Sequence, residues 1–118
     1  MKIRTIVELL DAKVLCGEDK LDGIVHSACG CDMMSDVLAF VKEQAVLLTG
    51  LCNPQVVRTA LMMDMRCIVF VRGKMPSADI LTLADEAGLV VLATGERMYT
   101  ACGKLYKNGL AGGEVENG

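Results

Sequence analysis

The feature that most constrains the fold of this chain is a pattern of strand, glycine and helix that occurs three times. The segments VLLTG (46–50), VFVRG (69–73) and VLATG (91–95) are apolar runs of β-forming residues, and each ends in a glycine. Apolar residues at helical spacing follow each run. Strands without polar alternation need both faces buried, as in a parallel sheet covered by helices on both sides. We therefore predict successive β-α units in one sheet.

The first 44 residues supply further elements. Residues 3–10 have one apolar face at helical spacing, and AKVLCG (12–17) reads as a strand. A second strand is expected at 24–29, joined to the first by either a hairpin or a short crossover, and its orientation is left open. A helix is expected from about Ser35, whose hydroxyl can cap it. The predicted fold is a three-layer α/β/α domain with a mostly parallel sheet of about five strands flanked by helices.

Composition limits both the size and the partners of this domain. The 118 residues are 53% hydrophobic with two prolines, which indicates one domain over 1–110, followed by a flexible tail at 111–118. Twelve basic and 15 acidic residues give a net charge of −3 without clusters of either sign, which argues against a nucleic-acid partner.

The sequence gives no sign of a membrane segment or of export. The longest uncharged stretch, 44–57, is shorter than the roughly 18 apolar residues that a membrane helix needs. Glu8 and Asp11 interrupt the first apolar patch, so we expect a cytoplasmic protein. Its six cysteines are then expected to be reduced thiols. A cysteine-rich and methionine-rich interior would also suit an anaerobe.

The turns after the three repeated strands form the candidate site. Ligands of open parallel sheets bind beyond the carboxyl ends of the strands. We expect Asn53 to cap the helix that begins at Pro54, Ser77 to cap the next, and Thr94 or Gly95 the last. Free amides at such helix starts, with one arginine among them, attract anions. The predicted ligand-binding residues are Thr49, Gly50, Asn53, Arg72, Gly73, Thr94 and Gly95.

The same residues also fit plain strand-to-helix corners, which need glycines and caps without any ligand. The chain contains neither a GxxxxGK[ST] phosphate loop nor a GxGxxG fingerprint. A nucleoside-triphosphatase or kinase is therefore not supported. No nucleophile, base and orienting group can be assembled either, so we predict a non-enzyme without a cofactor.

The segments IVELLDAKVLCGED, CDMMSDVLAF, LLTGLCNPQVVRTAL, CIVFVRGK and VVLATGERMYTACGKLY together resemble the DRTGG domain family. This family is similar to the N-terminal domain of HPr kinase/phosphorylase, and its members occur beside CBS domains in regulatory pyrophosphatases and as small single-domain proteins. The resemblance implies an α/β/α fold, a tendency to dimerise and a regulatory role, which is linked to adenine nucleotides in the members that contain CBS domains. The name-giving Asp-Arg-Thr-Gly-Gly run is absent here, and TGLCNPQ is the corresponding turn.

Three cysteines offer a different hypothesis. Cys29 and Cys31 would point to one face of an extended strand, where they could share a soft metal with His26 or Cys52. The CxC spacing is not that of zinc ribbons or of iron–sulfur sites, and free cysteine is often a buried small hydrophobe. A metal or redox role for Cys29, Cys31 and Cys52 is therefore the weaker alternative.

Three function hypotheses result. The first is a non-catalytic, homo-oligomeric regulatory module, which binds a small anionic ligand such as an adenine nucleotide at the carboxyl edge of the sheet. The second is a protein-interaction or dimerisation scaffold without a ligand, acting through an unknown protein partner. The third is a cysteine-based metal or redox accessory protein.

Overall fold

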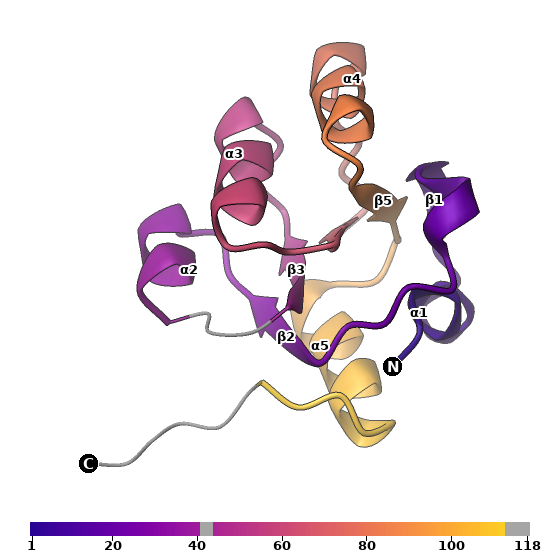
Figure 1. Ribbon diagram of the computed structural model, residues 1–118. Coiled ribbons are helices and arrows are strands. Elements are labelled where there is room, and N and C mark those ends of the chain that lie inside the picture. The colour runs from indigo at the N-terminus through magenta and orange to yellow at the C-terminus, as the bar shows by residue number, and fades with distance from the viewer. Residues whose placement is uncertain (41–43, 113–118) are drawn as a thin grey trace.

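The computed structural model describes residues 1–40 and 44–112, and in these residues five strands form one sheet (Figure 1). The strands are β1 (Lys13–Cys16), β2 (Ser27–Gly30), β3 (Ala45–Thr49), β4 (Cys67–Phe70) and β5 (Val90–Ala93). The helices are α1 (Ile3–Leu10), α2 (Met34–Phe40), α3 (Pro54–Met62), α4 (Ala78–Glu86) and α5 (Met98–Lys107), with a 3-10 turn, η1, at Glu18–Lys20.

The sheet has the order β1-β5-β4-β3-β2 and is mixed. Strands β2 to β5 run parallel, which settles the orientation of the second strand, whereas β1 is antiparallel to β5. The hairpin alternative for the first two strands is wrong, because β1 and β2 lie at opposite edges of the sheet. The predicted second strand also begins later than expected, since His26 precedes β2.

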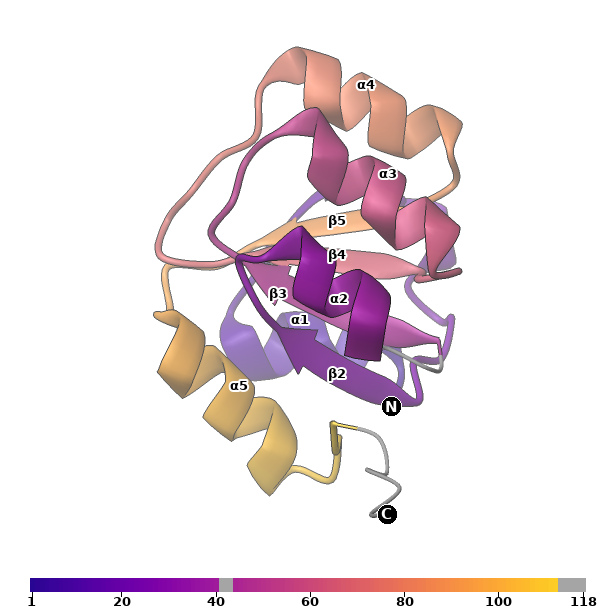
Figure 2. The same cartoon turned by 90° about the vertical axis from the view of Figure 1, so that its left-hand side faces the viewer.

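Helices cover both faces of the sheet, as the sequence predicts. Helices α1 and α5 lie on one face, and α2, α3 and α4 lie on the other (Figure 2). Every residue of β3, β4 and β5 is buried, and alternate side chains face the two helical layers. In β3, for example, Val46 packs against the α1 and α5 layer, whereas Leu47 packs against the other. The three-layer α/β/α prediction is confirmed.

The helix starts show which capping predictions hold. The Asn53 Oδ1 accepts from the Val56 N–H at 3.2 Å, next to Pro54 at the first position of α3. The Ser77 hydroxyl accepts from the Ile80 N–H at 3.5 Å and caps α4. The Ser35 prediction is wrong, because α2 already begins at Met34.

Beyond α5, the chain returns to the open edge of β2. Leu110 is buried, and the Ala28 N–H donates to the Ala111 carbonyl at 3.0 Å. Most of the predicted tail, 113–118, lies outside the described residues, and the domain boundary at residue 110 stays a prediction. None of the helices in the described part of the chain has the length and apolar character to span a membrane.

A buried hydroxyl joins α1 to the end of β5. The Thr94 Oγ1 donates to the Leu10 carbonyl at 2.7 Å and accepts from the Glu96 N–H at 3.2 Å. Thr94 is buried, so water cannot easily replace either bond. This hydroxyl holds together two segments that are 84 residues apart in the sequence.

We predict that Thr94→Val destabilises the fold by about 1–3 kcal/mol, because it leaves a buried carbonyl and a backbone N–H without their partner. Urea unfolding monitored by circular dichroism measures this difference. Thr82→Val is the matched control, since the Thr82 hydroxyl also donates to a carbonyl, that of Ala78 at 3.0 Å, but on an exposed helix surface. The control should change stability by no more than about 0.5 kcal/mol. Equal losses in both variants would contradict the prediction.

Candidate functional site

The turns that follow β2 to β5 lie at one edge of the sheet. Because these four strands are parallel, their carboxyl ends meet there, and Figure 2 shows the connections that follow β3, β4 and β5 on the left. We call this region the carboxyl edge; it comprises Asp32, Thr49–Gly50, Arg72–Gly73 and Thr94–Glu96. It holds six of the seven predicted ligand-binding residues, and Asn53 lies at the start of the helix that follows Gly50.

Asp32 holds the turn after β3 in place. Its Oδ1 accepts from the Thr49 hydroxyl at 2.9 Å and from the Gly50 N–H at 2.8 Å. The Thr49 hydroxyl in turn accepts from the Leu51 N–H at 3.1 Å. The Gly50 N–H lowers the pKa of Asp32 most, with smaller contributions from Thr49 and Arg72, although partial burial opposes them. A negatively charged carboxylate therefore lies at the edge where the sequence predicts an anion to bind.

Arg72, in the turn after β4, contacts each of the other three turns. Its backbone N–H donates to the Glu96 carbonyl at 2.8 Å, and the next N–H, of Gly73, donates to the Thr94 carbonyl at 3.0 Å. Its guanidinium lies directly over Gly50, so closely that a Cβ there would collide with it. The same group lies 3.9 Å from the Asp32 Oδ2, and both side chains are 49% exposed.

The backbone of Arg72 is strained for a residue with a side chain. Its φ is +61°, followed by +69° at Gly73. Left-handed backbone costs an ordinary residue about 1–2 kcal/mol, whereas glycine adopts it readily. The two backbone bonds to the β5 turn hold this conformation. Such outliers often accompany functional sites, because the surrounding structure must keep them in place.

The turn after β5 differs from its prediction. Neither Thr94 nor Gly95 caps the last helix, because α5 begins only at Met98 and Arg97 precedes it without a side-chain cap bond. The Thr94 hydroxyl is used by Leu10 and Glu96 instead. Gly95 is exposed and has open space where a Cβ would lie. The Glu96 carboxylate pairs with the Lys104 Nζ at 2.7 Å and ties this turn to α5.

The seven predicted residues thus divide by what their polar groups do. Gly50 and Arg72 contact each other, and Thr49 joins them through Asp32. Gly73 and Thr94 bond through their backbones. The Asn53 side chain is engaged as a helix cap. Only the Arg72 guanidinium among their side chains is both charged and half exposed at this edge.

The cysteine hypothesis gains no support from the geometry. All six cysteines are free. Cys29, Cys31 and Cys52 pack against the same helical layer, and burial is the main cause that raises the pKa of Cys29 and of Cys52. His26 is exposed. Within residues 1–40 and 44–112, no three His, Cys, Asp or Glu side chains are placed to hold a metal ion.

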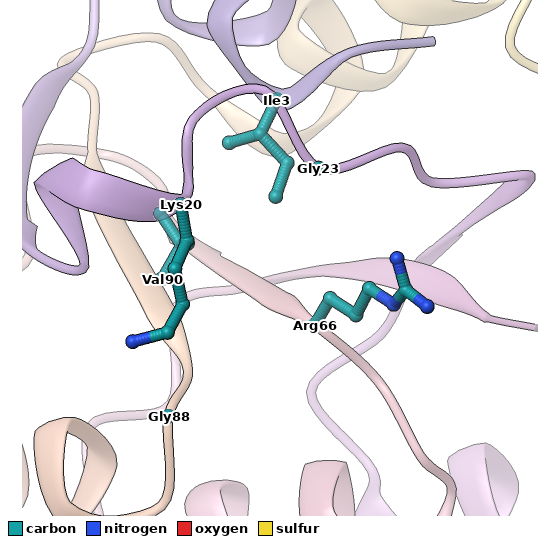
Figure 3. A pocket seen from close by; sticks show the side chains of 6 residues that line it. All are labelled: Ile3, Lys20, Gly23, Arg66, Gly88 and Val90. Atoms are coloured by element: carbon teal, nitrogen blue, oxygen red, sulfur yellow. The ribbon is translucent and has the colours of Figure 1, made fainter.

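A hollow that the sequence does not predict lies at the opposite edge of the sheet from the carboxyl edge, beside the amino ends of β4 and β5. It has a volume of about 370 Å³ and lies among Ile3, Gly23, Val90 and two basic side chains, Lys20 and Arg66. The charged ends of Lys20 and Arg66 point in different directions (Figure 3). Lys20 also lies 3.8 Å from Asp19. These cations are therefore not arranged to converge on one anion.

Comparison with known proteins identifies the family. The model of the DRTGG domain matches residues 5–107, which is most of the chain. The chain belongs to the DRTGG domain family. No curated protein matches the chain.

A solved structure agrees with this DRTGG assignment at the level of fold. The regulatory region of Clostridium perfringens pyrophosphatase, with its CBS and DRTGG domains in complex with the activator diadenosine tetraphosphate, is similar with a TM-score of 0.70. The sequence identity is 18%, and the match covers 88% of this chain. It covers 45% of the pyrophosphatase structure, so this DRTGG chain spans less than half of that length.

Two members of the carboxyl edge were missed by sequence reasoning. Asp32 reads as a residue near a helix start, yet it comes directly after β2, and this position in the chain is the signal that could have placed it here. Glu96 follows the third glycine by one residue, but its backbone bond to Arg72 depends on the unusual φ of Arg72, which a sequence pattern does not reveal.

We predict that Arg72→Gly is more stable than Arg72→Ala by about 1 kcal/mol, because both lose the guanidinium but only glycine relieves the left-handed strain. Urea unfolding of both variants measures the difference. The matched pair is Arg66→Gly and Arg66→Ala, at an exposed arginine that does not have a positive φ. There the glycine variant should be the less stable one. The same order of stability at both positions would contradict the assigned strain.

The Asp32 interactions predict a dependence of stability on pH. Its pKa is lower in the folded state than the value of about 3.9 expected when unfolded. Its contribution is therefore fully present above about pH 4 and is lost as the pH falls through the folded-state pKa. Unfolding midpoints of wild type and Asp32→Asn should be furthest apart near neutral pH and should converge in acid. A difference between the two unfolding midpoints that does not change with pH would show that the Asp32 charge contributes nothing to stability.

Proposed function

We propose that this DRTGG domain is a non-catalytic regulatory module that binds a small anionic ligand, such as an adenine nucleotide, at the carboxyl edge. The observation that supports this most directly is the placement of Arg72. A strained backbone, fixed by two hydrogen bonds, holds its guanidinium over the Gly50 turn while leaving half of it exposed. A planar guanidinium presented in this way suits phosphate or carboxylate groups.

Asp32 does not block such a ligand. Its contact with Arg72 is 3.9 Å long and lies between half-exposed groups, so the pair is weak and screened by water. A ligand phosphate can replace the Asp32 Oδ2 as the partner of the guanidinium. Asp32 then keeps its bonds to Thr49 and Gly50 through its Oδ1. Lys74 adds a second positive charge, close enough to Cys52 to oppose the rise in the pKa of that thiol.

The class of ligand is suggested by the fold neighbour. The pyrophosphatase region with CBS and DRTGG domains is regulatory and was solved with a nucleotide activator. An adenine nucleotide is therefore the first class to test here. A module of this kind must pass its signal to another copy of itself or to another protein, so we include homo-oligomer formation in the proposal.

We predict that an adenine nucleotide raises the midpoint of thermal unfolding. A ligand at a hundred times its Kd adds about 2.7 kcal/mol to stability, which corresponds to several degrees in a domain of this size. Adenine and guanine mono-, di- and triphosphates should be compared in parallel. Arg72→Ala should lower the affinity for the nucleotide that binds by about tenfold or more, because a hydrogen bond to a charged group contributes about 1.5–3 kcal/mol.

Arg66→Ala is the control for this experiment, since it removes an exposed arginine at the opposite edge of the sheet. Its affinity for the nucleotide should equal that of the wild type. If no nucleotide shifts the wild-type midpoint, the nucleotide proposal is wrong and the turns act as structural corners. If a nucleotide binds but Arg72→Ala binds it equally well, the ligand lies elsewhere.

A further inference from the structure

A hollow that is separate from the carboxyl-edge turns lies between α5 and β2. Its volume is about 550 Å³, which is within the range of small-molecule sites. Its floor includes Ala28 and Gly30 of β2, Gly103 of α5, and Gly112. These residues have almost no side chains, so few of their atoms project into the hollow. Gly30 in turn permits the Cys102 sulfur of α5 to approach β2 closely.

Two aromatic rings form the rim of this hollow, which we call the α5–β2 pocket. Tyr99 and Tyr106 are seven residues apart on α5, hence on the same side of the helix, and Gly103 lies between them. Their side chains are 90% and 72% exposed, which is unusual for large aromatic groups. They are the only two tyrosines of a chain that has no tryptophan. Exposed rings beside residues with almost no side chains leave room for a flat aromatic ring.

The charged side chains of α5 are basic, Lys104 and Lys107. Among residues 1–40 and 44–112, none that lines the pocket is charged, and α5 contains no acidic residue. Tyr99 and Thr100 are in the first turn of α5, whose N–H groups receive no side-chain cap and form the positive end of the helix dipole. Lys107 follows Gly103 by four residues and therefore lies beside it.

We propose that the α5–β2 pocket binds a small molecule that has a flat aromatic ring and one negatively charged group. The ring would lie on the glycine floor against Tyr99 and Tyr106, and the anionic group would lie near the start of α5 or near Lys107. The site is separate from the proposed nucleotide site, because none of the carboxyl-edge residues lines it. Either proposal can therefore be confirmed or refuted without the other.

The test uses 8-anilinonaphthalene-1-sulfonate as an aromatic anion and N-phenyl-1-naphthylamine as the same ring system without the charge. Proton NMR reports directly on the pocket, because the two tyrosine ring systems are the only ones of their kind in the chain. We expect both tyrosines to shift on saturable binding of the sulfonate. The uncharged compound should bind several-fold more weakly, and Tyr99→Ala should reduce the affinity for the sulfonate about tenfold, as expected for a lost stacking partner.

Gly103 provides a variant that fills the pocket without harming the fold. A Cβ there would have no atom within 4 Å, and glycine inside a helix is less stable than alanine or leucine. Gly103→Leu should therefore raise the unfolding midpoint and abolish binding of the sulfonate. Gly103→Ala, the matched control, should raise the midpoint similarly and keep most of the affinity. Arg72→Ala should bind the sulfonate as the wild type does.

Two results would overturn this proposal. One is binding of the sulfonate with equal affinity to wild type and Gly103→Leu, which would place the probe elsewhere. The other is that the tyrosine resonances do not shift with either compound but broaden as the protein concentration rises. That result would assign the face of α5 to a second copy of the chain instead of a small molecule.

Discussion

The burial of β3, β4 and β5 on both faces is the constraint on which the rest of the structure depends. Every side chain of these strands is withdrawn from water, so each face of the sheet requires a helical layer. The parallel connections supply α2, α3 and α4 to one face, while α1 and α5 cover the other, and the carboxyl ends of β2 to β5 meet at one edge. The candidate site is a consequence of this arrangement, because four turns that are distant in the sequence are brought together there.

Polar bonds between the turns give this edge its particular geometry. Asp32 accepts from two donors of the β3 turn, while the backbone of Arg72 and Gly73 donates to the β5 turn. The side chain of Arg72 then returns toward Gly50 and Asp32. A single residue with a left-handed backbone thus connects all four turns. This explains how an arginine keeps a conformation that glycine would adopt more easily.

The sequence predicts this fold where patterns are local and fails where the contacts are long-range. The apolar runs of the central strands, and the caps Asn53 and Ser77, depend on neighbouring residues and are confirmed. The placement of β1 at the far edge, antiparallel to β5, depends on pairing across most of the chain and could not be read from composition or spacing. Thr94 shows the same limit, since its hydroxyl bonds to Leu10 and not to the local helix start.

Glu96 links the two regions where we propose ligands. Its carbonyl accepts from the Arg72 N–H at 2.8 Å, and its carboxylate accepts from the Lys104 Nζ of α5 at 2.7 Å. The β4 turn and α5 are therefore connected through one residue, with two short bonds. A ligand that pulls Arg72 out of its strained conformation would disturb the Glu96 carbonyl bond, and through Glu96 the start of α5. Hydrogen-bond networks of this kind can carry energetic coupling between a binding site and a second surface.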